Sequence, residues 1–141
     1  MGTNNGVRLG SVFGIPIILD NSFFISAVLI TIYLGLSIFP DRIHPAPSTV
    51  TVWGLAVIAG IIFFISLLLH EIAHSMMARF YKLPVLSITL FLLGGVSRIS
   101  KEVDRPHKEF LVAFIGPLTS AGLGLAFIMG HQATGADTRP F

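Results

Sequence analysis

Three long uncharged runs of apolar residues dominate this 141-residue sequence. They cover residues 21–39, 50–69 and 110–130, and each approaches or exceeds the ~20 residues that a helix needs to cross a bilayer. Hydrophobic residues make up 53% of the chain and charged residues only 11%, whereas a soluble domain carries about 25% charged residues. The runs therefore predict an α-helical membrane protein with three transmembrane helices, integral and multi-pass.

The basic residues are distributed unevenly between these runs. The loop between the first and second runs has only Arg42, beside Asp41, whereas the segment between the second and third runs has six: Arg79, Lys82, Arg98, Lys101, Arg105 and Lys108. The positive-inside rule then predicts a cytoplasmic 79–108 segment and an external 40–49 loop. The net charge of +2 is too small to indicate a nucleic-acid partner.

A His-Glu-x-x-His motif, residues 70–74, lies at the end of the second run. Residues four apart lie on one face of a helix, so His70 and His74 can reach one metal ion together. Neutral imidazoles suit Zn²⁺, and the chain has no cysteine to supply thiolates. Glu71 projects about 100° from His70, where it can act as a general base toward water. We predict a Zn²⁺ site near the cytoplasmic end of this span, with His70 and His74 as ligands and Glu71 as the catalytic residue.

The alternative is a helix end where two histidines meet water and bind no metal. The chain has 5 histidines in 141 residues, so a chance match to the motif is rare. Ionisable groups at membrane depth also usually have a function. Both arguments favour the metal site.

Two stretches outside the spans have the pattern of strands. Residues 7–20 predict a short β segment of two strands with a turn near Phe13-Gly14, in which Pro16 limits the second strand to an edge; an interfacial coil is the alternative. Residues 85–100 predict a β-hairpin with its turn at Gly94-Gly95. The edge of that hairpin can take an extended substrate segment, which makes Gly94 and Gly95 candidate substrate-binding residues. The alternative is a hairpin that merely joins two helices.

The helical spans have further signals. The second span is expected to continue through the metal motif, over 50–81, and to end before Pro84. In the third span, 110–130, Pro117 should loosen the helix locally. Gly116, Ser120 and Gly124 recur at four-residue spacing, and this small-residue face is expected to pack on the metal-bearing span.

In its order of features the sequence resembles the site-2 proteases, zinc metalloproteases that cut within the membrane. The resemblance rests on residues 70–74, Gly94-Gly95, residues 113–118 (Ala-Phe-Ile-Gly-Pro-Leu), and residues 14–17 (Gly-Ile-Pro-Ile), which resemble prokaryotic members, including those with CBS domains. It implies zinc at His70 and His74, Glu71 as base, and substrate entry beside the hairpin. It also implies cleavage of transmembrane protein substrates in regulated proteolysis, in a prokaryotic cell membrane.

The sequence departs from that family in one respect. The family takes its third zinc ligand from an Asp in a further span, within an Asn-Pro-x-x-x-Asp-Gly-like stretch that this sequence lacks. Glu102, Glu109 and Asp137 are poor substitutes, because they are expected in a surface connector or in the external tail. We therefore expect residues 1–141 to be the N-terminal portion of a single membrane metalloprotease domain, and to be at most weakly active on their own.

The leading functional hypothesis is an intramembrane zinc metalloprotease whose partners are a transmembrane protein substrate and membrane lipid; self-association into a homo-oligomer stays open. One alternative is a non-catalytic scaffold, a pseudoprotease that binds transmembrane partners. A metal transporter that uses His70 and His74 as a transit site is weaker, because it gives Glu71 no role.

Overall fold

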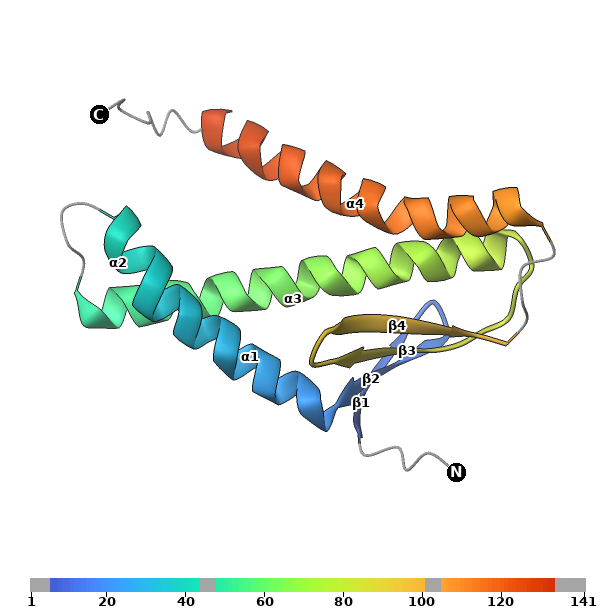
Figure 1. Ribbon diagram of the computed structural model, residues 1–141, viewed down its shortest axis with the longest axis horizontal. Helices are drawn as coiled ribbons and strands as arrows, with labels where there is room; N and C mark the ends of the chain where they lie inside the picture. The colour runs from blue at the N-terminus through green and yellow to red at the C-terminus, as the bar shows by residue number, and fades with distance from the viewer. Residues whose placement is uncertain (1–5, 44–47, 101–104, 134–141) are drawn as a thin grey trace.

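A long central helix organises the fold, in a computed structural model that describes residues 6–43, 48–100 and 105–133. This helix, α3 (Thr49–Phe80), lies between α4 (Pro106–Ala133) on one side and a β-sheet with α1 (Asn21–Tyr33) on the other (Figure 1). The sheet covers only the half of α3 that leads to its C-terminal end. That half carries the metal motif.

The helices begin and end where local chemistry satisfies the backbone. Asp20 caps α1, accepting from the Ser22 amide at 2.9 Å, and Ser48 caps α3, accepting from the Thr51 amide at 3.2 Å. After α1 the chain continues as a π-helix, η1 (Leu34–Ile38), and then as a short α2 (Phe39–Arg42). Helix thus extends beyond the expected limit at Phe39. Pro40 lies in the first turn of α2, directly after η1.

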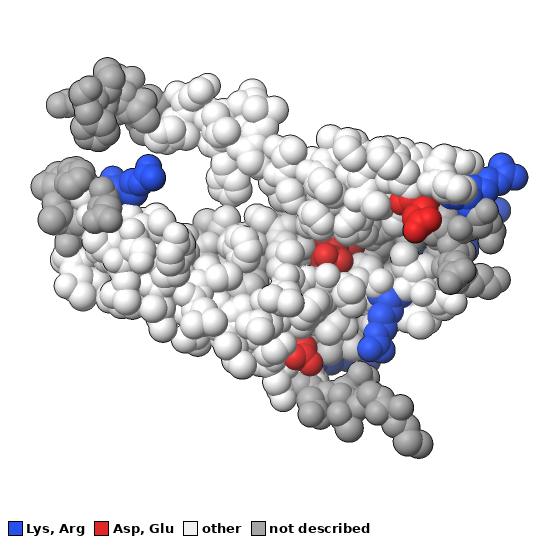
Figure 2. Space-filling view, in the orientation of Figure 1, with Lys and Arg blue, Asp and Glu red and all other residues white. Residues whose placement is uncertain are grey.

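Among the described residues, three helices are long and apolar enough to cross a membrane, over Asn21–Ile38, Thr49–Phe80 and Pro106–Ala133. This result confirms the number and positions of the predicted apolar helices, although α4 begins four residues before the predicted limit of 110. Lys and Arg atoms lie at the end of the molecule where α3 ends and α4 begins, in the region of the sheet, and near α2 (Figure 2). Most of the surface in this view carries no charge.

The four strands form one sheet in the order β1-β2-β3-β4. The first two are β1 (Gly6–Val12) and β2 (Ile15–Asp20), paired antiparallel, as are the hairpin strands β3 (Val85–Phe91) and β4 (Gly94–Ile99). A short parallel pairing of Ile17–Leu19 with Ile88–Leu90 joins the two pairs. The predicted N-terminal strands and hairpin are therefore present, but as parts of one sheet.

Two details of the predicted sheet were wrong. Pro16 does not confine β2 to an edge, because β2 lies between β1 and β3; Pro16 is tolerated since the pairing with β3 begins only at the next residue. The hairpin turn is not at Gly94-Gly95 either. Phe91 pairs with Gly94, so the turn residues are Leu92 and Leu93, and both glycines belong to β4.

The core lies between the sheet and α3. Ile15, Leu19, Ile88 and Leu90 are buried together, and partly buried side chains pack against them, among them Leu67, Leu68 and Ile72 of α3. Leu67 and Leu68 precede the metal motif in sequence, and Ile72 lies within it. Burial of these side chains, at about 25 cal/mol per Å² of apolar surface, therefore fixes the sheet against the part of α3 that carries the candidate site.

The small-residue face of α4 is only partly in contact with α3. Gly116 and Ser120 contact the two histidines of the motif, whereas a Cβ on Gly124 would meet nothing within 4 Å. Pro117 lies inside α4, which bends along its length in Figure 1. The expected packing therefore holds for the first two of these residues.

Candidate metal centre

Helix α3 brings together the three residues that the motif predicts. His70, Glu71 and His74 each offer one ligand atom, and these atoms lie within 4.8 Å of one another. The two imidazole rings are one helical turn apart, with centroids at 4.7 Å. In the described parts of the chain, no other His, Cys, Asp or Glu joins this group.

Helix α4 fixes the orientation of both rings through their Nδ1 atoms. His74 Nδ1 lies 2.6 Å from the Val112 carbonyl oxygen, and His70 Nδ1 lies 2.8 Å from Ser120 Oγ. A carbonyl can only accept, so His74 Nδ1 carries the proton and its Nε2 carries a lone pair. When His70 Nδ1 donates to Ser120 Oγ, His70 has the same tautomer, with the proton on Nδ1 and the lone pair on Nε2. Bonds of this kind orient metal-binding histidines in known sites and make their second nitrogen a better ligand.

The two Nε2 atoms point to the place where Gly116 of α4 has no side chain. A Cβ at Gly116 would overlap His74 Nε2 and would lie 2.5 Å from His70 Nε2. Only glycine leaves this space open. The gap therefore lies where an ion shared by the two nitrogens would be held.

Glu71 lies beside the histidines in a buried position, with 7% of its surface exposed. Its carboxylate Oε2 accepts a hydrogen bond from Ser97 Oγ of β4 at 3.1 Å. On β4, two residues before Ser97, Gly95 also faces Glu71: a Cβ there would come within 2.7 Å of Glu71 Cδ. The hairpin thus packs its backbone directly against the carboxylate.

This donor set fits zinc. Two neutral imidazole nitrogens are ligands that Zn²⁺ takes in catalytic sites, at roughly 2.0–2.1 Å each, and the Glu71 carboxylate lies beside them in the position of a base. Among the other candidate ligands, Glu109 is exposed in the first turn of α4, whereas His44, Glu102 and Asp137 lie outside the described residues. The described residues therefore supply two histidines and the adjacent Glu71.

Comparison with known proteins decides the family. Residues 58–135, more than half of the chain and including the whole motif, match peptidase family M50. The chain belongs to peptidase family M50. A solved site-2 protease from Methanocaldococcus jannaschii is similar to this M50 member in structure, with a TM-score of 0.64 and 30% sequence identity. The match covers 90% of this chain and 51% of that one. The predicted resemblance to the site-2 proteases is confirmed.

Curated relatives of this M50 member are named as zinc metalloproteases. A candidate zinc metalloprotease from Synechocystis is 39% identical over 132 residues, covering 92% of this chain and 34% of the relative. A zinc metalloprotease from Methanocaldococcus jannaschii is 31% identical over 129 residues, covering 92% of this chain and 33% of the relative. The chain thus spans about a third of the length of these relatives.

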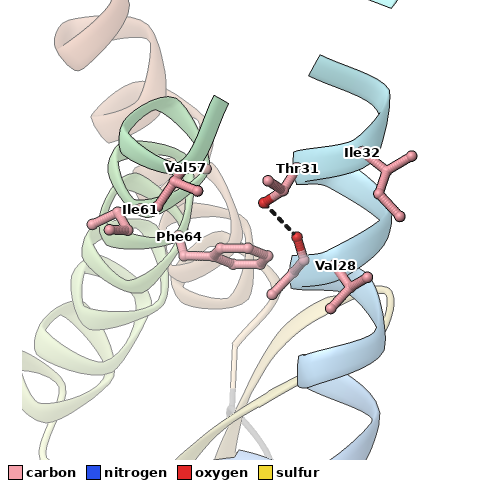
Figure 3. A pocket seen from close by; sticks show the side chains of 8 residues that line it. Val28, Thr31, Ile32, Val57, Ile61 and Phe64 are labelled. Atoms are coloured by element: carbon pink, nitrogen blue, oxygen red, sulfur yellow. Dashed lines mark hydrogen bonds between the residues drawn. The ribbon is translucent and has the colours of Figure 1, made fainter. Parts of the chain in front are cut away.

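Two apolar cavities are lined by residues other than His70, Glu71 and His74. One of about 340 Å³ separates α1 from α3 and is lined by Ala27, Val28, Thr31, Ile32, Val57, Gly60, Ile61 and Phe64 (Figure 3). Its one hydroxyl, on Thr31, donates to the Ala27 carbonyl of its own helix at 2.8 Å. A second, of about 330 Å³, is lined by Ala73, Met76, Met77, Phe80 and Ile115. Neither cavity presents an ionisable side chain, so neither adds chemistry to the centre.

Sequence reasoning missed the residues that surround Glu71. Ser97 has no motif and no ligand-type spacing, and only the three-dimensional packing of β4 on α3 brings it to the carboxylate. Ser75 lies one turn after Glu71 on α3 and donates to Ser97. The Val112 carbonyl is a backbone group, for which a sequence gives no signal. Ser120 and Gly116 had a signal in their four-residue spacing, although that spacing indicated helix packing and not contact with the histidines.

Proposed function

We propose that this chain carries the metal centre of an intramembrane zinc metalloprotease that hydrolyses peptide bonds of transmembrane proteins in regulated proteolysis. One observation carries the proposal. Two histidine Nε2 atoms converge on a gap that only glycine leaves, and a buried glutamate lies beside them. The family and the names of the relatives support proteolysis as the reaction class.

In the proposed mechanism His70 and His74 hold zinc, and Glu71 is the general base and general acid. Zinc, when bound, supplies Lewis acidity for the peptide carbonyl and for water. Glu71 takes a proton from the attacking water and gives it to the nitrogen of the leaving amine. Its burial supports this role, because a carboxylate with few competing waters exerts a stronger electrostatic effect on its neighbours.

We further propose that the substrate binds as an added strand on β4, next to Gly94 and Gly95. A peptide bond within a helix is shielded by its own hydrogen bonds, so a protease in the membrane must bind an extended segment. Within the described residues β4 pairs only with β3, which leaves its other edge for a new strand. The contact of Gly95 with Glu71 supports this position, since a strand there would run past the proposed base.

We place the centre near the cytoplasmic surface of the prokaryotic cell membrane, in contact with membrane lipid. Helix α3 has 32 residues and is therefore ~48 Å long, against ~30 Å for the hydrocarbon core. A span of ~20 residues from Thr49 would end near Leu68, just before the motif. The basic residues Arg79, Lys82, Arg98, Arg105 and Lys108 follow at this end and support a cytoplasmic orientation.

The shared sheet gives independent support for this topology. Strands β1 and β2 precede the first apolar helix, and β3 and β4 follow the second, yet all four strands pair in one sheet. Strands of one sheet lie on the same side of a membrane. The chain must then cross an even number of times between them, which agrees with crossings by α1 and α3.

Zinc content and cleavage, measured together on the full-length protein purified in detergent, test the proposal. Glu71→Gln should retain zinc and lose cleavage of a labelled single-span peptide by about 100-fold or more, because the base is gone while both ligands remain. His70→Ala should lose zinc. Cleavage at the unaltered rate by Glu71→Gln would contradict the assigned role, and a wild-type protein without zinc would favour the scaffold hypothesis.

A further inference from the structure

The hydroxyl of Ser97 lies at the centre of a small hydrogen-bond network between the hairpin and α3. Ser97 Oγ is 3.1 Å from Glu71 Oε2 and 3.3 Å from the Glu71 backbone oxygen. Ser75, one helical turn beyond Glu71, lies 3.0 Å from Ser97 Oγ and is fully buried. A chain of hydrogen bonds therefore connects Ser75, Ser97 and the Glu71 carboxylate, and the Ser75 side chain in it is buried.

The direction of these bonds follows from the number of protons. Ser75 Oγ donates to Ser97 Oγ, so the single hydroxyl proton of Ser97 is directed to Glu71. The backbone oxygen of Glu71 is already the acceptor of the helical amide of Ser75. A carboxylate is the stronger acceptor, because hydrogen bonds to ionised groups are roughly twice as strong as neutral ones. The Ser97 proton is thus directed to Oε2.

Gly95, on the same strand as Ser97, limits the position of the Glu71 carboxylate. A Cβ at Gly95 would lie 3.0 Å from Glu71 Oε1, so the backbone of β4 closes one side of the carboxylate while Ser97 holds its other oxygen. No other side chain donates to Glu71 among the hydrogen bonds of the described residues. The orientation of the proposed base is therefore set by the hairpin and not by α3 alone.

We infer that Ser97 is a positioning residue for Glu71, and that Ser75 orients the Ser97 hydroxyl. The inference rests on the proposed function, since it assigns to Ser97 the orientation of the proposed base. It also gives the hairpin a second task. A substrate strand added to β4 would be held by the same strand that fixes the carboxylate, so the distance between base and substrate would be set within one element.

The test compares Ser97→Ala with Ser97→Thr, which keeps a hydroxyl, and with Ser100→Ala, an exposed serine just after β4. Cleavage of the labelled single-span peptide is measured as kcat and KM, together with zinc content and thermal unfolding. Ser97→Ala should lower kcat by about 10- to 100-fold with KM, zinc content and Tm unchanged, because a small misplacement of a catalytic group costs up to about that factor. Ser97→Thr should recover most of the loss, and Ser100→Ala should behave as wild type.

Two further measurements separate positioning from a general structural role. In a Glu71→Gln background, Ser97→Ala should cause no further loss of cleavage, because the two residues act as one unit. The infrared carboxylate band that disappears in Glu71→Gln should shift in Ser97→Ala, with or without substrate. An unchanged kcat and an unchanged band in Ser97→Ala would overturn the inference even if Glu71→Gln is inactive. A cleaving Glu71→Gln protein would instead overturn the proposed function.

Discussion

The Nε2 atom of His74 points to the place that a Cβ on Gly116 would fill. This relationship joins α3 and α4 at the two histidine rings. Helix α4 brings Gly116 against both rings and supplies both Nδ1 acceptors, the Val112 carbonyl and Ser120 Oγ. The orientation of the proposed ligands therefore depends on α4 as much as on the helix that carries them.

Gly116→Ala should abolish zinc binding without unfolding the protein. The added methyl group would occupy the space between the two Nε2 atoms, whereas alanine favours a helix by about 1 kcal/mol over glycine. Zinc stoichiometry of the purified protein measures the effect. Gly124→Ala is the matched control on the same helix, since nothing lies within 4 Å of that position, and it should keep its zinc. Full zinc content in Gly116→Ala would show that the ion is held elsewhere.

Ser120→Ala should weaken zinc binding while leaving it measurable. The substitution removes the partner of His70 Nδ1, and loss of such a partner typically costs 10- to 100-fold in metal affinity. Competition with a chelator of known affinity gives the change. Thr119→Ala serves as the control, because the Thr119 hydroxyl donates to the Ile115 carbonyl of its own helix at 2.8 Å. Equal affinities for the two variants would argue against a role of Ser120 in the metal centre.

Gly95→Ala should separate zinc binding from catalysis. The three atoms nearest to the new Cβ all belong to the Glu71 side chain, so zinc should stay bound while cleavage falls by about 100-fold. Leu93→Ala, in the exposed hairpin turn, should cleave at the wild-type rate. A Gly95→Ala protein as active as wild type would mean that the hairpin can move away from Glu71 at no cost to the reaction.

Acidification should remove the contribution of Asp20 to stability. Hydrogen bonds from the Ser22 hydroxyl and then from the Ser22 amide lower the pKa of the Asp20 carboxyl below its ordinary value of 3.8. A lowered folded-state pKa means that the contribution is complete above the ordinary value and is lost as the pH falls through the folded value. Asp20→Asn keeps the cap but cannot titrate. The difference in Tm between wild type and this variant should therefore shrink as the pH is lowered through this range, and a difference independent of pH would contradict the prediction.

The features that could be predicted are those fixed by local sequence. The position of His70 and His74 on one helix face follows from their spacing, and the three apolar helices follow from long uncharged runs. The N-terminal strands and the hairpin follow from their β-forming residues. In each case the information lies within a single segment of the chain.

The features that were missed depend on contacts between distant segments. Gly94-Gly95 has the composition of a hairpin turn, yet Gly95 is required where β4 approaches Glu71, and the turn is formed by Leu92 and Leu93. Ser97 looks like an ordinary strand residue until β4 is packed on α3. The interior position of β2 likewise depends on a pairing with β3, which no local pattern indicates.

The parallel pairing of Ile17–Leu19 with Ile88–Leu90 also restricts the order in which the protein can be assembled. During synthesis β2 is made before both of the first two apolar helices, and its partner β3 only after them. In the proposed topology the sheet cannot close until α1 and α3 have entered the lipid and returned the chain to its starting side. Since the sheet holds the hairpin against Glu71, that topology brings the carboxylate into place only after membrane insertion, and a nascent chain that has not completed insertion would lack the assembled centre.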